Sequence, residues 1–574
     1  MVTDQAMAQK VLPKHRWWLI IAGLMIVLAG GALAQFVRTA DGTTVRDIRF
    51  TGTNGVVMSA LLFVPKNATS SSPAPGILAV HGYINSRETQ DAFAIEVARR
   101  GYVVLSLDQT GHGYSGGAAF SNGFGGADGL RYLRSLPMVD TDQIGLEGHS
   151  MGGWTVLAAA ADMPEAYSSM VLVGSSTGAP FAPEGSATWP RNLGLVFSRY
   201  DEFSKLMWDV DRAQDSPSSE KLKTVFGTDT AVVEKRLYGA IAAGTARKLY
   251  QPNTTHPGDH FSAAAIGNAT EWFAATLDGG TPRPVGDQIW YWKEVGTGVG
   301  LIGFIMIMLG AFDVLVRLPF FAPMRAEPTP AADHRDRRWW RTFTVNTALP
   351  ALLFFPTFIA ASLLLPASNT LPQAVTTQIA FWAVVGAGVS LLAGRFMRSP
   401  ADKHQSDWVR SMLLAAATVA AGYWALWLVD QLFLTDFRLW VVAVKLPDFR
   451  QFGIAAIYVV PITFTFLVMV RSLSTATVRG DTGRLQYMAA ISTLTGGFVV
   501  MLSVIYGSFF MSGSLITAFD PLSTVIALQF VPVLTAVAII GIFTWRRTGS
   551  YRPGGLIAGV LVTLYVVAGT ATQI

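Results

Sequence analysis

Eight apolar segments in the second half of the chain restrict its fold more than any other feature of the sequence. They cover residues 296–317, 342–365, 377–394, 411–434, 452–470, 487–510, 523–545 and 554–572. A helix of about 20 apolar residues spans the hydrocarbon core of a bilayer. The chain is also 51% hydrophobic and only 14% charged, which is more apolar than a water-soluble globule can accommodate. Residues 289–574 are therefore predicted to form an all-α membrane domain with about eight transmembrane helices.

A ninth apolar segment lies near the N-terminus. Residues 17–37 are uncharged, and they follow a tail, residues 1–16, that contains Lys10, Lys14 and Arg16. A basic tail followed by an apolar segment is typical of signal sequences, and Ala-Leu-Ala at residues 32–34 resembles a signal-peptidase site. The segment has, however, the length of a membrane-spanning helix. We expect an uncleaved transmembrane anchor, with cleavage as the alternative, and both interpretations export the residues that follow.

The charges between the apolar segments predict how the chain is oriented. With a cytoplasmic tail and nine crossings every loop is assigned a side, and cytoplasmic loops are expected to be rich in Lys and Arg. Fifteen such residues lie in the predicted cytoplasmic loops: Arg325, Arg335, Arg337, Arg338, Arg341, Arg395, Arg398, Lys403, Arg410, Arg471, Arg479, Arg484, Arg546, Arg547 and Arg552. The outer loops contain only Arg438, Lys445 and Arg450, in one loop whose residues 439–442 are expected to lie at the membrane interface. The bias predicts a multi-pass cell-membrane protein with residues 38–288 and the C-terminus outside the cytoplasm.

The absence of cysteine and the distribution of the basic residues exclude several classes of protein. The chain contains no cysteine, which excludes disulfides, thiolate chemistry and cysteine-based zinc or iron–sulfur sites. A sequence pI near 9.3 is common among nucleic-acid-binding proteins, but here the basic residues lie mostly in short loops between apolar segments. We expect membrane lipids and no nucleic acid as partners, and neither a metal nor another cofactor. No feature of the sequence specifies an oligomeric state.

Residues 38–288 alternate short β-type runs with helical stretches and contain no spanning segment. The runs cover residues 45–50, 56–64, 76–80, 102–107, 143–147, 170–173, 193–197 and 246–252. The first two flank residues 51–55, where Asn-Gly is typical of a tight hairpin turn. The later runs are short and continuously apolar, as in buried strands of a parallel sheet. The alternation predicts an α/β domain with a mostly parallel sheet.

Residues 148–152, Gly-His-Ser-Met-Gly, follow the run at 143–147 and precede an Ala-rich helical stretch. A strand, the pattern G-x-S-x-G and a helix form a nucleophile elbow, in which a tight turn strains the serine backbone and the glycines avoid clashes. The chain contains 55 glycines, so the pattern alone occurs easily by chance. Its position between a strand and a helix makes it specific. Ser150 is predicted to project above the sheet as a nucleophile.

A second motif lies upstream, where His81, Gly82 and Tyr83 follow the run at 76–80. Together with the elbow, this motif makes residues 45–280 resemble the α/β-hydrolase superfamily, particularly its dienelactone-hydrolase and serine-esterase branches. The resemblance implies acyl transfer in which Ser150 attacks a carbonyl carbon. It also implies that the backbone N–H groups of Met151 and Tyr83 bind the oxyanion, and that an acid and then a histidine follow Ser150.

Two histidines lie late enough in residues 38–288 to be the base that the resemblance implies. His256 comes four residues after Pro252, which ends the last predicted strand, and members of the superfamily often carry their base there. His260 lies closer to the helix predicted after Ser262, where it would shape the loop instead. We favour His256 and keep His260 as the alternative.

Two aspartates are candidates for the acid. Asp201 follows the predicted strand 193–197 at the spacing at which the superfamily places its carboxylate. Asp229 ends a Gly-Thr-Asp turn one residue earlier than expected, although its separation from His256 is the more usual one. We favour Asp201, which requires an insertion at residues 209–245 before the last strand, and Asp229 remains the alternative.

These observations predict a membrane-embedded serine hydrolase that cleaves an acyl ester or lipid-like substrate on the outer face of the membrane. A serine peptidase is the alternative within the same chemistry. A transporter or receptor whose hydrolase-like domain processes or binds its ligand is the alternative from another class. Pro461 and the pair Gly496-Gly497 could break their helices as transporter sites require, but such residues are also tolerated in ordinary helix bundles.

Overall fold

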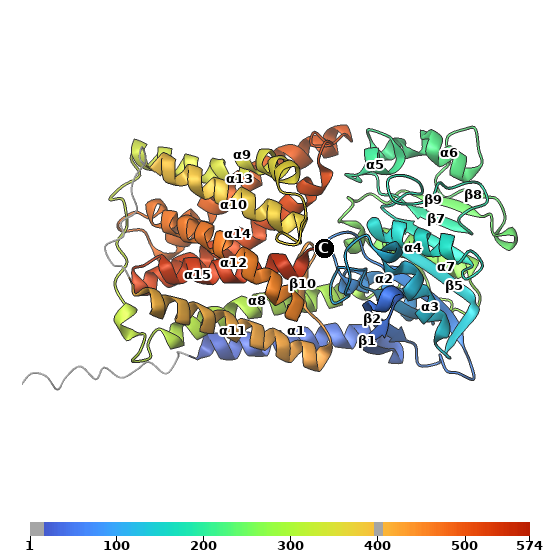
Figure 1. Ribbon diagram of the computed structural model, residues 1–574, viewed down its shortest axis with the longest axis horizontal. Helices are drawn as coiled ribbons and strands as arrows, with labels where there is room; N and C mark the ends of the chain where they lie inside the picture. The colour runs from blue at the N-terminus through green and yellow to red at the C-terminus, as the bar shows by residue number, and fades with distance from the viewer. Residues whose placement is uncertain (1–16, 395–405) are drawn as a thin grey trace, which may run out of the picture.

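Two regions lie end to end in the structure, a computed structural model that describes residues 17–394 and 406–574 (Figure 1). A β-sheet with flanking helices forms the sheet region, residues 44–276. Nine long helices among the described residues form the bundle. The predicted tail 1–16 and the loop charges Arg395, Arg398 and Lys403 lie outside the described residues.

A nine-stranded sheet with the order β1-β2-β4-β3-β5-β6-β7-β9-β8 organises the sheet region. The strands are β1 (Thr44–Thr51), β2 (Val57–Val64), β3 (Ala74–Val80), β4 (Val103–Leu107), β5 (Val139–His149), β6 (Ser169–Val173), β7 (Leu193–Val196), β8 (Leu237–Tyr238) and β9 (Arg247–Tyr250). The pairs β1–β2, β2–β4 and β8–β9 are antiparallel, and all other neighbours are parallel. The mostly parallel sheet confirms the predicted fold class.

Alternate residues of the strands face two separate cores. On β3, Leu78 and Val80 lie in one core, whereas Ile77 and Ala79 lie in the other, as the period of two along a strand requires. The helices of the first face are α3 (Gly126–Ser135) and α4 (Met151–Asp162), and those of the second are α2 (Asp91–Ala98) and α7 (Ala263–Thr276). Helices α5 (Ser204–Trp208) and α6 (Glu220–Phe226) lie between β7 and β9, and α6 falls within the insertion expected at residues 209–245.

Nine helices within the described ranges are long and apolar enough to cross a membrane. They are α1 (Trp18–Arg38), α8 (Trp290–Leu315), α9 (Arg337–Leu364), α10 (Ala374–Ala393), α11 (Trp408–Phe433), α12 (Phe449–Leu473), α13 (Gly483–Ser512), α14 (Pro521–Thr548) and α15 (Arg552–Gly569). Each coincides with a segment predicted from hydropathy. Several begin a few residues earlier, because short polar or aromatic stretches extend the helices beyond their apolar centres.

Helix α1 packs along α8 with almost no space between the two backbones. A Cβ atom on Gly30 would lie 2.4 Å from the carbonyl O of Gly296, and one on Gly23 would lie 2.9 Å from the carbonyl O of Gly303. Small residues allow this close approach, which increases the van der Waals contact that holds helices together in lipid. The N-terminal segment is therefore an integral element of the bundle.

Helices α12 and α13 run without a break through Pro461 and the pair Gly496-Gly497. Pro461 lies inside α12, and Gly496 and Gly497 lie inside α13. A Cβ atom on Gly497 would lie 2.1 Å from the carbonyl O of Thr347 on α9, so this glycine permits close helix packing. Of the two interpretations of these residues, the structure agrees with toleration in a packed bundle.

The loop between α11 and α12 contacts the sheet region. It forms a hairpin, β10 (Phe437–Leu439) and β11 (Val442–Val444), and Nε1 of Trp440 at its tip donates to the carbonyl O of Pro257 at 2.9 Å. Trp440 is thus held against the sheet region, whereas Leu439 stays 48% exposed, and the placement of residues 439–442 at a membrane interface stays a prediction. Arg438, Lys445 and Arg450 all bond to the sheet region as well.

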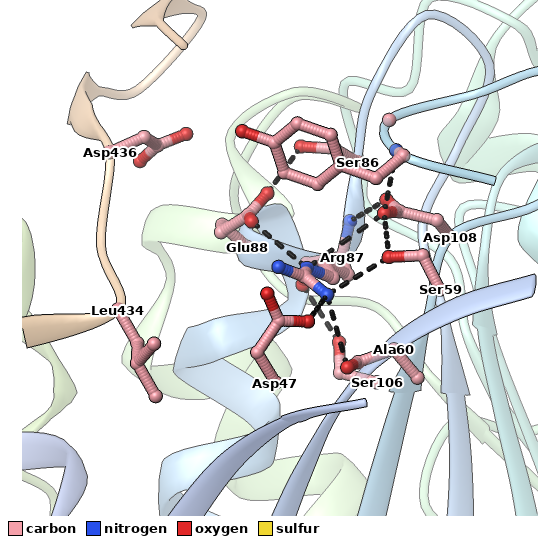
Figure 2. A network of polar contacts seen from close by, with 12 residues as sticks. Asp47, Ser59, Ala60, Ser86, Arg87, Glu88, Ser106, Asp108, Leu434 and Asp436 are labelled. Atoms are coloured by element: carbon pink, nitrogen blue, oxygen red, sulfur yellow. Dashed lines mark hydrogen bonds and ion pairs between the residues drawn. The ribbon is translucent and has the colours of Figure 1, made fainter. Parts of the chain in front are cut away.

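A buried polar network fastens this hairpin to Glu88, just before α2, and through Arg87 to the sheet. Figure 2 shows the part of the network around Arg87 and Glu88. Nζ of Lys445 lies 2.9 Å from Oε2 of Glu88, and Nε of Arg87 lies 3.1 Å from Oε1 of the same carboxylate. Figure 2 shows Arg87 directed toward Asp47 on β1 and Ser59 on β2. Burial disfavours the charge of Glu88, but Lys445, Arg87 and the nearby Arg438 outweigh it and hold the pKa of this carboxyl well below its usual value.

Candidate active site

Ser150 lies at the turn between β5 and α4, with φ 55° and ψ −121°. This backbone conformation is strained for a non-glycine residue, and such strain is typical of functional turns. The N–H of Ser150 donates to the carbonyl O of Val173 on β6 at 2.9 Å. A Cβ atom on Gly152 would lie 2.1 Å from the carbonyl O of Val80, so only glycine fits there. The turn fixes the backbone from which the Ser150 hydroxyl projects.

His256 and Asp201 follow adjacent parallel strands. Asp201 lies in the turn after β7 and His256 in the loop after β9. Nδ1 of His256 lies 2.8 Å from Oδ2 of Asp201, and both side chains are buried. Burial lowers the pKa of His256, but the charge of Asp201 and its hydrogen bond outweigh this effect and raise the pKa above its usual value. When Nδ1–H donates to the carboxylate, Nε2 remains free to accept a proton.

One cavity of about 430 Å³ connects these groups. Ser150 and His256 both line it, as do Tyr83 and Met151, whose N–H groups were expected to bind an oxyanion. A Cβ atom on Gly82, next to Tyr83, would lie 3.1 Å from the Cβ atom of Ser150. The volume lies in the range typical of small-molecule sites. The structure thus brings all five favoured residues to one place in the fold: Ser150, His256, Asp201, Tyr83 and Met151.

The alternative residues lie in different environments. His260 is buried, with its ring centroid 4.1 Å from that of His149, and neither of its ring nitrogens has a hydrogen-bond partner among the described residues. Burial lowers its pKa to about 3. Asp229 is exposed in a turn after helix α6, and it does not follow a strand. A carboxylate thus accompanies His256 but not His260, and Asp229 lies outside the lining of the cavity.

The sequence of this region matches a known hydrolase family. Residues 71–233 match a family model described as serine aminopeptidase, S33. The matched segment includes the elbow at Ser150, the turn at Tyr83 and the candidate acid Asp201. The sheet region is an α/β hydrolase. The family match covers this hydrolase region only, and the bundle lies outside it.

Solved structures that are similar to part of the chain include an esterase, a hypothetical protein and an α/β hydrolase. An esterase of Pyrococcus furiosus is 18% identical, with a TM-score of 0.29, over 41% of this chain and 93% of that one. A hypothetical protein of Pseudomonas aeruginosa is 15% identical, with a TM-score of 0.31, over 42% and 96%. An α/β hydrolase of a Penicillium species is 24% identical, with a TM-score of 0.20, over 25% and 48%. A comparison with curated proteins found no match.

The bundle completes the cavity of the hydrolase. The apolar part of its contribution comes mainly from the hydrolase-side ends of three helices: Val375 and Ile379 of α10, Pro521, Leu522, Val525 and Ile526 of α14, and Val566 of α15. Its polar part includes Glu294 of α8, Arg438 and Lys445 of the hairpin loop, Gln529, Tyr565 and Thr570. Trp440 and Val441 of the hairpin line the cavity as well. Sequence reasoning missed this wall, because nothing local in these segments shows that they meet Ser150.

Glu202 is a second acid beside His256 that sequence reasoning also missed. Its Oε2 accepts the backbone N–H of His256 at 2.8 Å, and its Oε1 accepts the hydroxyl of Tyr506 on α13 at 2.9 Å. Burial, and then the charge of Asp201, raise the pKa of Glu202 to about 7. The only signal in the sequence was its position directly after Asp201. In the described ranges, no group of three or more His, Asp or Glu side chains is arranged to hold a metal ion.

Proposed function

We propose that this chain is a membrane-embedded serine hydrolase that cleaves acyl esters with Ser150 as nucleophile, His256 as base and Asp201 as the acid that orients it. The observation that carries the proposal is the 2.8 Å contact between Nδ1 of His256 and Oδ2 of Asp201, beside a cavity that His256 shares with the strained Ser150. A nucleophile, a base and an orienting carboxylate in this relation are the recurring arrangement of serine hydrolases.

The proposed reaction has two halves. Oγ of Ser150 bonds to the carbonyl carbon of the ester while its proton moves to Nε2 of His256. The carbonyl electron pair moves onto oxygen, where the N–H groups of Met151 and Tyr83 are proposed to stabilise it. When that pair returns, the bond to the alcohol oxygen breaks and His256 donates its proton to the alcohol. Water then attacks the acyl-enzyme, gives one proton to His256, and releases the acid as Ser150 regains its proton.

The proposed placement in the membrane follows from how the helices meet the hydrolase. Residues 1–16 would be cytoplasmic, 17–37 an anchor, 38–288 an extracytoplasmic hydrolase domain and 289–574 a membrane domain. Helix α14 begins at the cavity, so its last turn lies at the opposite end of the bundle. The end of α14 and the start of α15 carry the basic residues Arg546 and Arg552 there, and the cytoplasmic ends of membrane helices are typically basic. This charge bias supports an active site on the outer face.

Labelling with a fluorophosphonate tests the nucleophile. The full-length protein in detergent should react covalently, and Ser150→Ala should abolish both labelling and ester hydrolysis, with a loss of about a millionfold in kcat. A serine outside the cavity, such as Ser512, provides the control, because Ser512→Ala should label like the unaltered protein. Full labelling of Ser150→Ala would reject the proposed nucleophile.

A peptidase is the second candidate, because the family that residues 71–233 match is described as a serine aminopeptidase. The same triad cleaves esters and amides, so the two candidates differ only in substrate. Aminoacyl anilides and acyl esters with the same leaving-group chromophore distinguish them. We expect a higher kcat/KM for the esters, and a preference for free-amino anilides would favour the peptidase.

A further inference from the structure

The cavity at Ser150 continues from the hydrolase into the interior of the bundle. Building on the proposed function, we infer that the groove formed by α10, α14 and α15 binds the acyl chain of a lipid ester that lies in the bilayer. The groove is the bundle wall of the same cavity and needs no conformational change to connect with Ser150. Its occupant is therefore the part of the substrate that is bonded to the reacting carbonyl.

The lining of the groove is chemically suited to a hydrocarbon chain. Ile526 of α14 and Val375 of α10 are almost completely buried, at 2% and 3% exposure. Gln529 and Tyr565 are the polar residues deeper in the groove, and the Tyr565 hydroxyl donates to Oε1 of Gln529. Because these two side chains bond to each other, they place no unpaired hydroxyl against a chain. An aliphatic chain gains free energy in such a site through its apolar contact alone.

The depth of the groove matches an acyl chain better than a short ester. The lining residues of α14 extend from Pro521 to Gln529, which is about 12 Å along a helix that rises about 1.5 Å per residue. In the proposed membrane placement, this is about two fifths of the hydrocarbon core of about 30 Å. The groove therefore ends at the depth where the chains of membrane lipids lie.

The geometry at Ser150 indicates whether the acyl part or the alcohol part of the ester lies in the bundle. His256 gives its proton to the leaving alcohol, so the alcohol must lie on the His256 side, where Phe203 contacts the histidine ring. The Tyr83 turn is proposed to hold the carbonyl oxygen, and Tyr83 and Ile84 pack against the core of the bundle. Nε2 of Gln573, just after α15, also donates to the Tyr83 hydroxyl at 2.8 Å. The acyl side therefore points toward the bundle.

Filling the groove tests this inference. The measured quantity is the ratio of kcat/KM for nitrophenyl dodecanoate to that for nitrophenyl acetate, with full-length protein in liposomes. Each methylene group that the groove no longer binds should cost about fourfold in kcat/KM. We expect Val525→Trp to lower the ratio at least tenfold. The matched control is Val500→Trp on α13, where the valine is 65% exposed and does not line the cavity, and it should keep the original ratio.

The same variants test the direction of the ester. Acetate esters of long alcohols carry their chain on the leaving side, so Val525→Trp should not discriminate against them relative to Val500→Trp. An unchanged dodecanoate-to-acetate ratio in Val525→Trp would overturn the inference, as would an equal discrimination against long alcohols. Hydrolysis of the acetate ester that still depends on Ser150 would leave the proposed function intact in either case.

A second experiment needs no variant of the groove. A fluorophosphonate whose alkyl chain carries a diazirine reacts with Ser150 and, on illumination, crosslinks to the residues beside the chain. We expect crosslinked peptides from α14 or α10. Crosslinks confined to the hydrolase region would reject the groove as the acyl site. If the unaltered protein neither reacts with the probe nor hydrolyses any ester, the proposed function itself fails, which is a distinct result.

Discussion

The proposed catalytic groups on the hydrolase wall of the cavity come from turns at strand ends, whereas the apolar part of the bundle wall comes from three long helices. Ser150, His256 and the Asp201 that bonds to His256 each follow a strand of one parallel sheet, so short turns determine their positions. On the second wall, residues such as Val375 and Ile526 are positioned only when separate helices pack together. The proposed chemistry therefore depends on the local conformation of a few turns. The proposed binding of the acyl chain depends instead on how separate helices pack against one another.

Replacement of the two candidate histidines of the hydrolase wall should give the largest difference between two variants, measured as the loss of kcat. His256→Ala should lower kcat by about 10⁴-fold or more, because it removes the group that accepts the Ser150 proton. His260→Ala should lower kcat by less than about tenfold, since no carboxylate accompanies His260. Ester hydrolysis by both purified variants measures the difference. If His260→Ala is the inactive protein, the assignment of the base is wrong.

The junction between the walls should contribute strongly to stability. Lys445→Met leaves Glu88 buried without its lysine partner, and breaking a buried ion pair costs about 3–5 kcal/mol of unfolding free energy. The matched pair at the other end of the bundle is Arg479 with Asp333, at 2.7 Å but largely exposed. Arg479→Met should cost less than about 1 kcal/mol. Thermal unfolding of both variants in detergent checks the contrast, and equal losses would contradict it.

The smallest effect should appear in the pH dependence of the reaction. Ionised Glu202 raises the pKa of His256, so Glu202→Gln should lower that pKa. Because the neutral imidazole is the active base, the acidic limb of the kcat/KM profile should move to lower pH. Tyr506→Phe removes a hydrogen bond that favours ionised Glu202, so it should move the limb in the same direction by a smaller amount. A shift to higher pH in either variant would contradict this coupling.

The contrast between the walls also explains what the sequence could predict. The strands, the elbow at Ser150 and the long helices follow from local patterns, because hydropathy, glycine positions and strand length act over a few residues. Asp201 was distinguished from Asp229 by its position after a strand, which is again local. The contact of Trp440 with Pro257 was not predictable, since it joins residues 183 positions apart. Pro461 left two interpretations open from the sequence, because a proline either breaks a membrane helix or is tolerated inside a packed one.

The hydrogen bond from Gln573 to Tyr83 has a consequence for the order in which the site is made. It joins residues 490 positions apart, and it lies at the turn that is proposed to hold the oxyanion. Nearby, Thr572 exchanges two backbone hydrogen bonds with Gly111 and Ala119. A ribosome completes the hydrolase strands long before it reaches these residues. The nascent hydrolase region therefore lacks one side of its cavity until α15 has been inserted, so that full activity has to await the complete chain.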